Sequence, residues 1–294
     1  MAADRWDARG RKVLVTGAAR GIGAGTAREL AARGARVSLV GLEPDRLEAL
    51  AGELGGDAAW FEADVRDVDA LERAVAGTVE RFGGIDVVVA NAGIRNPMAT
   101  VATVDPPAFE RVIEVNLLGT WRTVRAVLPQ LVESRGYLLC VASLAAAAHG
   151  PLFAPYAAAK AGVEAFANCL RLEVEEQGVD VGVAYFSFIE TDMVREGREV
   201  AEAQAGRPPP RPMTRTLPVA KAARGVVRGI ERRSQRVVVP RYVYPLILAN
   251  ELLRPAVDAV TRRQAGDLLS AARERPERDP ETSPLGSGDG RAAG

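Results

Sequence analysis

The sequence predicts a doubly wound α/β fold, with a mainly seven-stranded parallel sheet and helices on both faces. Short apolar runs of strand length alternate with longer runs of helical length from residue 12 to residue 240, which is the order that a parallel sheet with crossover helices requires. The runs Ile85–Ala90 and Tyr137–Val141 are almost entirely apolar. Such continuous runs are typical of strands that are covered on both faces.

The composition fits one large domain with a short extension. The chain has 294 residues, of which 48% are hydrophobic, and this suffices for a large core. We expect one domain over residues 1–240, a helical extension over 241–270 and a disordered tail over 271–294, where Pro, Gly, Ser and charged residues dominate. The 38 basic and 38 acidic residues leave no net charge, which argues against a nucleic-acid partner.

The sequence also predicts a cytoplasmic protein without a metal site or a transmembrane segment. Its N-terminus carries no apolar signal region, and Cys140 and Cys169 lie where small buried hydrophobes belong, so we expect no disulfide. One histidine does not support a metal site. The amphipathic segment 241–264 is too short in its apolar part to span a bilayer; we expect it to seal a pocket, meet a second subunit or touch a membrane surface, in that order of preference.

The first strand and helix form a nucleotide-binding pattern. The strand Lys12–Thr16 leads into the turn Gly17-Ala-Ala-Arg-Gly21-Ile-Gly23 and then into a helix that ends near Arg33. Glycines at these places permit a tight turn in which the backbone approaches a pyrophosphate, while the helix N-terminus supplies amide groups. A second strand, Ala35–Val40, completes a βαβ unit. The pattern therefore favours cofactor binding over a purely structural turn.

The end of the second strand bears on which dinucleotide binds. An acidic residue there accepts hydrogen bonds from ribose hydroxyls, whereas a basic residue accommodates a 2′-phosphate. Here Gly41 and Leu42 follow the strand, and Glu43 comes next. Glu43 is either a partner of the ribose or an acidic residue in the first turn of the helix Pro44–Leu54, and both readings fit equally well. Arg20 is an alternative partner for a 2′-phosphate. The prediction is NAD(H) or NADP(H), with a slight preference for NAD(H).

The next elements continue the alternation of strands and helices. Asp64 and Val65 follow one strand, and Asn91, Ala92 and Gly93 follow another. Asn116 lies inside a predicted helix although asparagine has a low helix propensity. The expected strands and helices of this part are Ala58–Glu62, Val68–Phe82, Ile85–Ala90 and Phe109–Leu131.

Three polar residues form a candidate catalytic group. Ser143 lies just past the strand Tyr137–Val141, where a parallel sheet binds ligands. Tyr156 and Lys160 have the spacing that places them on one face of the helix Pro155–Gln177. A nearby cation favours the phenolate form of a tyrosine, which allows proton exchange with a substrate oxygen. Taken alone, such a pair is more often a half-buried aromatic beside a solvated amine.

The last part of the sheet precedes a change in composition. Strands are expected at Val179–Phe186 and Arg236–Pro240. Between them, the proline-rich stretch 207–212 is unable to continue a helix. We therefore expect residues 191–218 to form either a mobile flap over a substrate or an ordinary surface excursion.

These residues together resemble the classical short-chain dehydrogenase/reductase family, which has a Rossmann-type fold. The resemblance covers about Arg11 to Pro240 and rests on several motifs in the family's order and spacing. They are Thr16-Gly-Ala-Ala-Arg-Gly-Ile-Gly23, Asp64-Val65, Asn91-Ala-Gly93, Asn116, Ser143 and Tyr156-x-x-x-Lys160.

The resemblance implies an NAD(P)-dependent oxidoreductase that interconverts a secondary alcohol and a ketone. Tyr156 would be the general acid/base, and Ser143 would hydrogen-bond the substrate oxygen. Lys160 would lower the pKa of the phenol and bind the nicotinamide ribose, and Asn116 would hold a water that connects the lysine to solvent. The implied cofactor-binding residues are Gly17, Ala19, Arg20, Gly21, Ile22, Gly23, Glu43, Asp64, Val65, Asn91, Ala92, Gly93, Tyr156, Lys160, Ile189 and Thr191.

One departure from the family lies beside the expected nicotinamide site. Phe186-Ser187 replaces the usual Pro-Gly after the sixth strand, although Ile189 and Thr191 are still able to bond the carboxamide. Phe186 would add apolar surface, which favours a small to medium, mainly apolar substrate. His149 is either a substrate contact, as this loop provides in the family, or an exposed loop residue.

The resemblance leaves two rival functions and one assembly to consider. The same residues could reduce an imine or an activated double bond, or the chain could be a non-catalytic dinucleotide-binding regulator; the presence of all four residues of the catalytic set argues against the second. Members of the family pair subunits through the helices Phe109–Leu131 and Pro155–Gln177, so a homotetramer or homodimer is expected.

Overall fold

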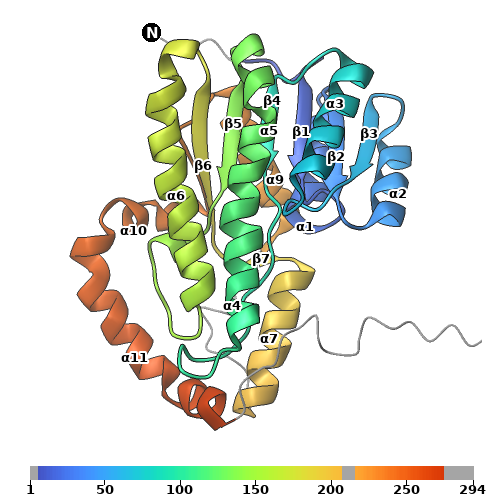
Figure 1. Ribbon diagram of the computed structural model, residues 1–294. Coiled ribbons are helices and arrows are strands. Elements are labelled where there is room, and N and C mark those ends of the chain that lie inside the picture. The colour runs from blue at the N-terminus through green and yellow to red at the C-terminus, as the bar shows by residue number, and fades with distance from the viewer. Residues whose placement is uncertain (1–5, 207–215, 275–294) are drawn as a thin grey trace, which may run out of the picture.

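The centre of the structure is a seven-stranded sheet with the strand order β3-β2-β1-β4-β5-β6-β9 (Figure 1). The computed structural model describes residues 6–206 and 216–274. Every pairing in the sheet is parallel, so the predicted fold class is confirmed. The strands are β1 (Lys12–Thr16), β2 (Arg36–Gly41), β3 (Ala58–Glu62), β4 (Val87–Ala90), β5 (Tyr137–Val141), β6 (Asp180–Phe186) and β9 (Arg236–Val239).

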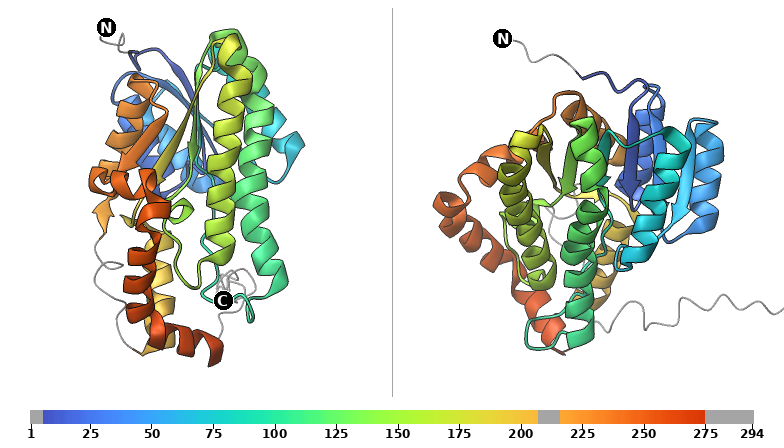
Figure 2. Two further views of the ribbon diagram at one scale, coloured as in Figure 1. Left: turned by 90° about the vertical axis from the view of Figure 1, so that its left-hand side faces the viewer. Right: turned by 45° about the horizontal axis from the view of Figure 1, so that its top comes forward.

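Helices cover both faces of the sheet (Figures 1 and 2). One face carries α1 (Gly21–Ala31), α2 (Pro44–Leu54) and α9 (Val219–Glu231), and the other carries α3 (Val68–Phe82), α5 (Gly119–Ser134) and α6 (Ala154–Val174). Successive residues of a strand point to opposite faces. Val13 and Val15 of β1 therefore pack on one side, and Leu14 packs on the other.

The direction of strand addition reverses next to β1. The chain runs outward from β1 to β2 and β3, and then returns to place β4 on the other side of β1. Ligands of open α/β sheets bind in the crevice outside the strand ends at such a switch point. The glycine-rich turn after β1 and the segment that begins at Asn91 after β4 both start at this crevice.

The helix predicted over Phe109–Leu131 is three consecutive pieces. These are α4 (Pro106–Ile113), a π-helix (Glu114–Leu118) and α5. The amide of Gly119 donates to the carbonyl of Glu114, five residues earlier. One extra residue is accommodated at Asn116, and such π-bulges occur often at functional sites.

The region after β6 contains helices that the sequence analysis did not predict. Residues 191–218, expected as a flap, include the helix α7 (Asp192–Ala205), and α9 follows them. A short parallel pair, β7 (Ile189–Glu190) and β8 (Leu217–Pro218), joins the two ends of this region. The proline-rich stretch 207–212 lies outside the described residues.

The C-terminal extension is helical and longer than predicted. A 3₁₀-helix (Arg241–Val243) leads to α10 (Tyr244–Leu248) and α11 (Asn250–Glu274). Residues 271–274, expected to be disordered, therefore belong to α11, and 275–294 lie outside the described part. The extension runs past the carboxyl edge of the sheet toward α7 (Figure 2), and there Met98, Leu152, Ala201 and Ala272 form a small buried cluster.

The remaining regular elements of the described residues are two 3₁₀-helices, Leu144–Ala146 and Glu175–Gln177. Among the helices that the structure describes, none combines the length and apolar character that a bilayer crossing needs.

Candidate functional site

A cavity of about 540 Å³ opens at the carboxyl edge of the sheet, outside the ends of β1 and β4. Most residues predicted for the site lie in its wall. They are Gly17, Ala19, Arg20, Gly21, Ile22, Glu43, Asp64, Val65, Asn91, Ala92, Gly93, Ser143, Tyr156, Lys160, Phe186, Ile189 and Thr191. Gly23, Asn116 and His149 were also predicted and do not line this cavity.

The glycine-rich turn is packed backbone against backbone. Gly17 has a left-handed φ of +63°, and a side chain there would begin 2.8 Å from the Cα of Ala92. A Cβ on Gly23 would lie 2.1 Å from the carbonyl oxygen of Gly17. Both positions therefore exclude any residue with a Cβ unless the turn moves. Gly23 is buried, and it shapes the cavity wall without being part of it.

Asn91 and Thr16 fix the turn to the end of β4. The side-chain amide of Asn91 donates to the carbonyl oxygens of Thr16 (2.9 Å) and Gly17 (3.2 Å). In return, the hydroxyl oxygen of Thr16 accepts from the backbone amides of Asn91 (3.0 Å) and Ala92 (3.1 Å). These bonds set the width of the crevice between the two strands.

The two residues predicted to decide between the dinucleotides form an ion pair. The Nε of Arg20 lies 3.4 Å from a carboxylate oxygen of Glu43, and their side chains are 53% and 36% exposed. Such exposed pairs contribute about 0–1 kcal/mol to stability. The pair therefore opens at little cost, so either side chain is able to turn toward a ligand.

Asp64 is held by its neighbour Arg66. Its carboxylate accepts from the backbone amide of Arg66 (2.8 Å) and from two nitrogens of the guanidinium (2.9 and 2.6 Å). Burial alone would raise the pKa of Asp64, but these hydrogen bonds outweigh burial and lower it. A carboxylate with a lowered pKa therefore lies in the wall of the cavity.

Ser143 and Tyr156 meet at the other end of the cavity. Burial raises the pKa of the Tyr156 phenol, and a hydrogen bond with the Ser143 hydroxyl lowers it in part. Ser143 also accepts a hydrogen bond from the amide of Ala145 (3.1 Å). The raised pKa keeps the phenol protonated at neutral pH, which makes it a proton donor toward an oxygen bound beside it.

Lys160 is buried beneath the tyrosine. Its ammonium donates to the carbonyl of Val141 (2.8 Å) and lies 5.8 Å from the centroid of the Tyr156 ring. Burial lowers its pKa from 10.5 to about 8. The sequence predicted that this lysine lowers the pKa of Tyr156, whereas burial raises that pKa and the Ser143 hydroxyl is the group that lowers it in part.

Asn116 holds the loop that follows β4. Its side-chain oxygen accepts from the amide of Ile94 (2.8 Å), and its side-chain nitrogen donates to the carbonyl of the same residue (3.0 Å). The hydroxyl of Thr120 donates to the backbone carbonyl of Asn116 (2.9 Å). The buried side chain therefore positions the segment from Gly93 to Arg95 from behind the cavity wall.

Phe186 and Ser187, which stand where the family usually has Pro-Gly, continue the regular backbone of β6. The amide of Ser187 donates to the carbonyl of Val239 (3.1 Å), which extends the ladder between β6 and β9. In the part of the chain that the structure describes, the non-glycine residues with positive φ are Arg135, Leu152 and Arg233. Ser187 therefore needs no left-handed backbone, and the loop after β6 forms without glycine.

His149 lies away from the cavity. It is exposed, and its ring is 3.3 Å from the carbonyl oxygen of Ala146. This placement agrees with an exposed loop residue and gives no support to a substrate contact.

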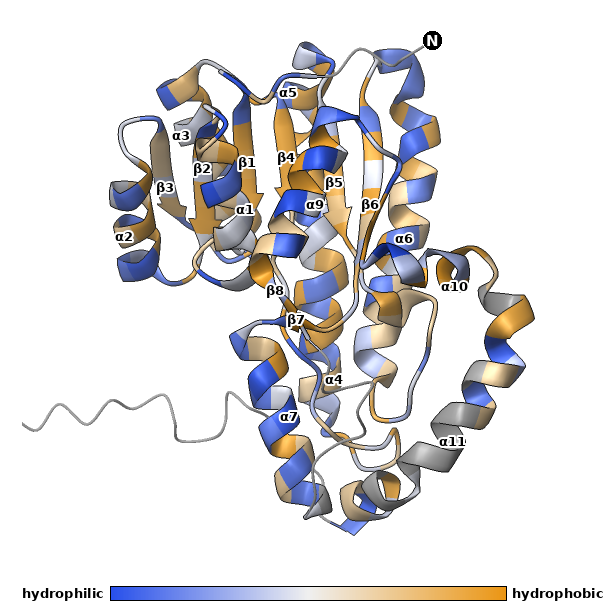
Figure 3. Cartoon of the chain, turned by 180° about the vertical axis from the view of Figure 1, so that it is seen from behind, coloured by the Kyte–Doolittle hydropathy of each residue, from blue (hydrophilic) through white to orange (hydrophobic). Residues whose placement is uncertain are grey.

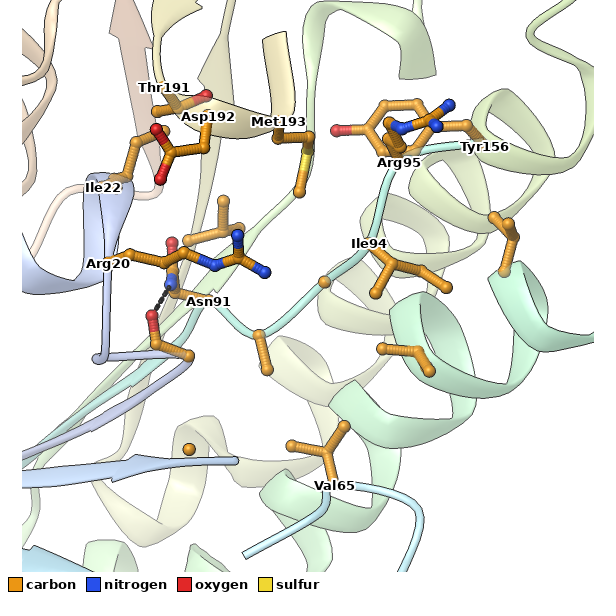
Figure 4. Close-up of a pocket in the computed structure, with 18 of the residues that line it drawn as sticks. Arg20, Ile22, Val65, Asn91, Ile94, Arg95, Tyr156, Thr191, Asp192 and Met193 are labelled. Carbon is orange, nitrogen blue, oxygen red and sulfur yellow. Dashed lines mark hydrogen bonds between the residues drawn. The ribbon is translucent and has the colours of Figure 1, made fainter. Parts of the chain in front are cut away.

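Several residues of the wall belong to no motif, and sequence reasoning missed them. Figure 4 shows Arg95 and Met193 at the same end of the cavity as Tyr156, and Arg20 toward the glycine-rich turn. Arg95 follows the Asn91-Ala-Gly93 motif by two residues, which was the one available signal. The other missed residues include Leu42, Arg66, Ile94, Pro97, Arg111, Asp192 and Glu196.

Comparisons with known proteins agree with this geometry. A family model described as short chain dehydrogenase matches residues 11–202. An uncharacterized oxidoreductase of Myxococcus xanthus (strain DK1622) is 35% identical over 261 residues, which cover 86% of this chain and 97% of that protein.

Two relatives carry more specific names. The L-fucose dehydrogenase of Oryctolagus cuniculus is 37% identical over 172 residues, covering 58% of this chain and 60% of that protein. The 3-oxoacyl-acyl-carrier-protein reductase of Escherichia coli (strain K12) is 35% identical over 187 residues, covering 63% of this chain and 76% of that protein. The match thus spans about three fifths of the first of these relatives.

Proposed function

Because this chain belongs to the short-chain dehydrogenase family, we propose that it interconverts a secondary alcohol and a ketone with NAD(H) or NADP(H). The observation that carries this proposal is that Ser143, Tyr156 and Lys160 line the same cavity as the glycine-rich turn. The names of two relatives, a dehydrogenase and a 3-oxoacyl reductase, support the same kind of chemistry.

The wall of the cavity fits a dinucleotide. The close packing at Gly17 and Gly23 leaves backbone where side chains would otherwise stand, and the N-terminus of α1 supplies amide groups for a pyrophosphate. Asp64 and Val65 would contact the adenine end, and Ile189 and Thr191 the nicotinamide carboxamide. The cofactor supplies or accepts the hydride when it is bound.

The protein's own part of the reaction would be proton transfer and orientation. In the reducing direction, the protonated Tyr156 donates its hydroxyl proton to the carbonyl oxygen. Ser143 donates a hydrogen bond to the same oxygen and stabilises the charge that develops on it. Lys160 would bind the nicotinamide ribose, and Asn116 fixes the neighbouring segment through its two hydrogen bonds to Ile94. The ordering of these groups lowers the entropic cost of reaching the reactive arrangement.

We propose NAD(H) as the preferred dinucleotide. Glu43 would accept hydrogen bonds from the ribose hydroxyls. While Arg20 is paired with Glu43, its guanidinium does not bind a 2′-phosphate. NADP(H) would require the pair to open. The exposure of both side chains makes this preference small.

The body of the substrate would be small to medium and mainly apolar. Phe186, Ile94, Pro97 and Met193 line the cavity, and they would bury carbon rather than hydroxyl groups.

The chain would act as a homo-oligomer in the cytoplasm. Trp121 on α5 and Leu172 on α6 are 40% and 65% exposed, and they lie on the two helices expected to pair subunits. Light scattering during gel filtration tests this, because a monomer would contradict it.

The function is tested by Tyr156→Phe. We expect the rate of hydride transfer to fall by about a thousandfold, since a positioned general acid contributes about 10²–10⁴. Turnover is followed by cofactor absorbance across a panel of alcohols and ketones, and cofactor binding by fluorescence. Tyr242→Phe, at an exposed tyrosine, is the matched control.

The outcomes separate the candidate functions. Normal turnover by Tyr156→Phe would contradict the proposed role of the phenol. Reduction of imines or activated double bonds, but of no ketone, would identify a different reaction at this site. Cofactor binding without turnover of any substrate class would favour a regulatory protein.

A further inference from the structure

The Tyr156 end of the cavity contains a positive charge that a purely apolar substrate does not need. Arg95 lines the cavity with Tyr156 and Ser143, and Figure 4 shows its guanidinium at the Tyr156 end. Its side chain is only 15% exposed. Because a charge is costly to bury unless it is paired and hydrogen-bonded, the partners of this arginine determine what it does.

The backbone on both sides of Arg95 is anchored. Asn116 makes two hydrogen bonds to Ile94 on one side. On the other side, the buried side-chain amide of Asn96 donates to the carbonyl oxygens of Pro97 (2.9 Å) and Leu152 (2.5 Å). Arg95 thus projects from a segment that is held at both ends, and such preorganisation lowers the cost of binding a ligand.

Arg95 donates a hydrogen bond from Nη1 to the carbonyl oxygen of Asn96 (3.2 Å), and one of its acidic partners is held loosely. The Nε of Arg95 lies 3.9 Å from a carboxylate oxygen of Glu196, whose side chain is 50% exposed. This distance exceeds the 2.7–2.9 Å of a charge-assisted hydrogen bond. Glu196 belongs to α7, and it lines the same cavity. A second carboxylate that enters the cavity is therefore able to replace it on the guanidinium.

We propose that the substrate carries a carboxylate, and that Arg95 binds this group in place of Glu196. The inference rests on the proposed oxidoreductase function and refines it. The substrate is then a keto or hydroxy acid with an apolar body, in which Ser143 and Tyr156 contact the reacting oxygen and Arg95 contacts the acid. Arg111 of α4 also lines the cavity and adds positive charge there.

The test uses two probes that differ in charge and by one methyl group, 4-oxopentanoate and its methyl ester. For the full chain with cofactor, reduction is followed by cofactor absorbance and binding by titration calorimetry. We expect the acid to be the better ligand. Arg95→Met should lower the acid-to-ester ratio of kcat/KM by about 10- to 100-fold, mainly through KM, because a hydrogen bond to a charged group is lost. Arg95→Lys should restore part of that ratio.

A substitution at Glu196 should have the opposite effect on acid binding to the substitution at Arg95. Glu196→Gln removes the competing carboxylate, so we expect the affinity for 4-oxopentanoate to rise by about threefold. Glu199→Gln is the matched control, because it removes the same charge from an exposed position of α7 that does not line the cavity. Thermal melting of each variant verifies that it folds.

Each result decides the inference. A fall in kcat/KM that is equal for acid and ester in Arg95→Met would overturn it, and would show that the arginine only ties the β4 loop to α7. Absence of acid binding to the wild type would overturn it as well. Arg95-dependent binding of the acid without reduction of either probe would support the inference and contradict the proposed function. Reduction of the ester without any preference for the acid would support the proposed function and contradict the inference about Arg95.

Discussion

The two ends of the cavity are built in different ways. At the end with the glycine-rich turn, which would hold the nucleotide, the spaces beside Gly17 and Gly23 are filled by neighbouring main chain and by the Asn91 side chain. At the Tyr156 end, side chains from loops and from α7 form the wall, among them Arg95, Met193 and Glu196. Gly17 and Gly23 leave no room for a Cβ at the first end, whereas the second end is shaped by the side chains that line it. We infer that packing fixes the choice of cofactor class, and that individual residues adjust the choice of substrate.

The largest expected effect comes from disturbing the backbone end. Gly23→Ala places a Cβ 2.1 Å from the carbonyl of Gly17, so the turn has to move. We expect cofactor affinity to fall by about a thousandfold, or ~4 kcal/mol, as measured by fluorescence titration. Gly52→Ala is the control, since nothing lies within 4 Å of a Cβ there. Cofactor affinity equal to that of the wild type would contradict the backbone-built wall.

The second effect concerns the buried amine beneath Tyr156. The pKa of Lys160 is lowered from 10.5 to about 8 by burial. Above pH 10.5 the amine is neutral in both states and carries no penalty. As pH falls from 10.5 to about 8, the unfolded chain takes up the proton before the folded chain does, so folded stability is lost.

Lys160→Met lacks this dependence on pH. The free energy of unfolding of the variant minus that of the wild type should therefore increase by ~3 kcal/mol as pH falls through this window, at 1.36 kcal/mol per pH unit. Below about pH 8 the difference should level off. Urea unfolding at a series of pH values measures it, and a difference that is the same at every pH would contradict the buried, partly deprotonated amine.

The third effect tests whether the C-terminal helix supports the side-chain end. Ala272 of α11 is fully buried in the cluster with Met98, Leu152 and Ala201. Ala272→Asp should destabilise the contact between α11 and α7 by about 2 kcal/mol, because it buries a polar group without a partner. Hydrogen exchange of both helices should accelerate while that of the sheet does not.

Ser270→Asp is the control for the C-terminal contact, because residue 270 is exposed on the same helix. If Ala272→Asp raises KM for the substrate and leaves cofactor affinity unchanged, the helix α11 supports only the Tyr156 end of the cavity. Equal loss at both ends would show that the helix supports the whole domain.

The smallest expected effect is at the exposed pair of the nucleotide end. Glu43→Gln releases Arg20 from its ion pair, so the NADP(H)-to-NAD(H) ratio of kcat/KM should rise by about tenfold, or ~1.4 kcal/mol. Arg20→Gln should shift the ratio the other way. An unaltered ratio in both variants would remove these residues from cofactor choice.

The sequence predicted the fold class and most strands, because a buried parallel strand is a local apolar pattern. The bounds of β3, β5, α2 and α3 agree with the prediction. The helix around Asn116 was wrong in detail, since no periodicity marks the extra residue of a π-bulge. Helices α7 and α9 were missed, the first because the adjoining proline-rich stretch dominated the interpretation of the whole segment.

The same division applies to the site. Motif residues such as Gly17, Asn91 and Tyr156 could be placed in one site because their motifs resemble those of a known family. Arg95 and Glu196 could not, because they come together only through the folding of α7 over the sheet edge. The direction of the Tyr156 pKa was also missed, since burial is set by the surrounding chain and not by spacing along one helix.

The contact between α7 and α11 has an evolutionary consequence. Both helices lie outside the sheet and its glycine-rich turn (Figure 3), and α7 is joined to the domain through the short β7–β8 pair. Insertions or replacements in α11 would reshape this end of the cavity without altering the sheet or its glycine-rich turn. A change confined to α11 would therefore be a route by which the same sheet and turn serve a different substrate.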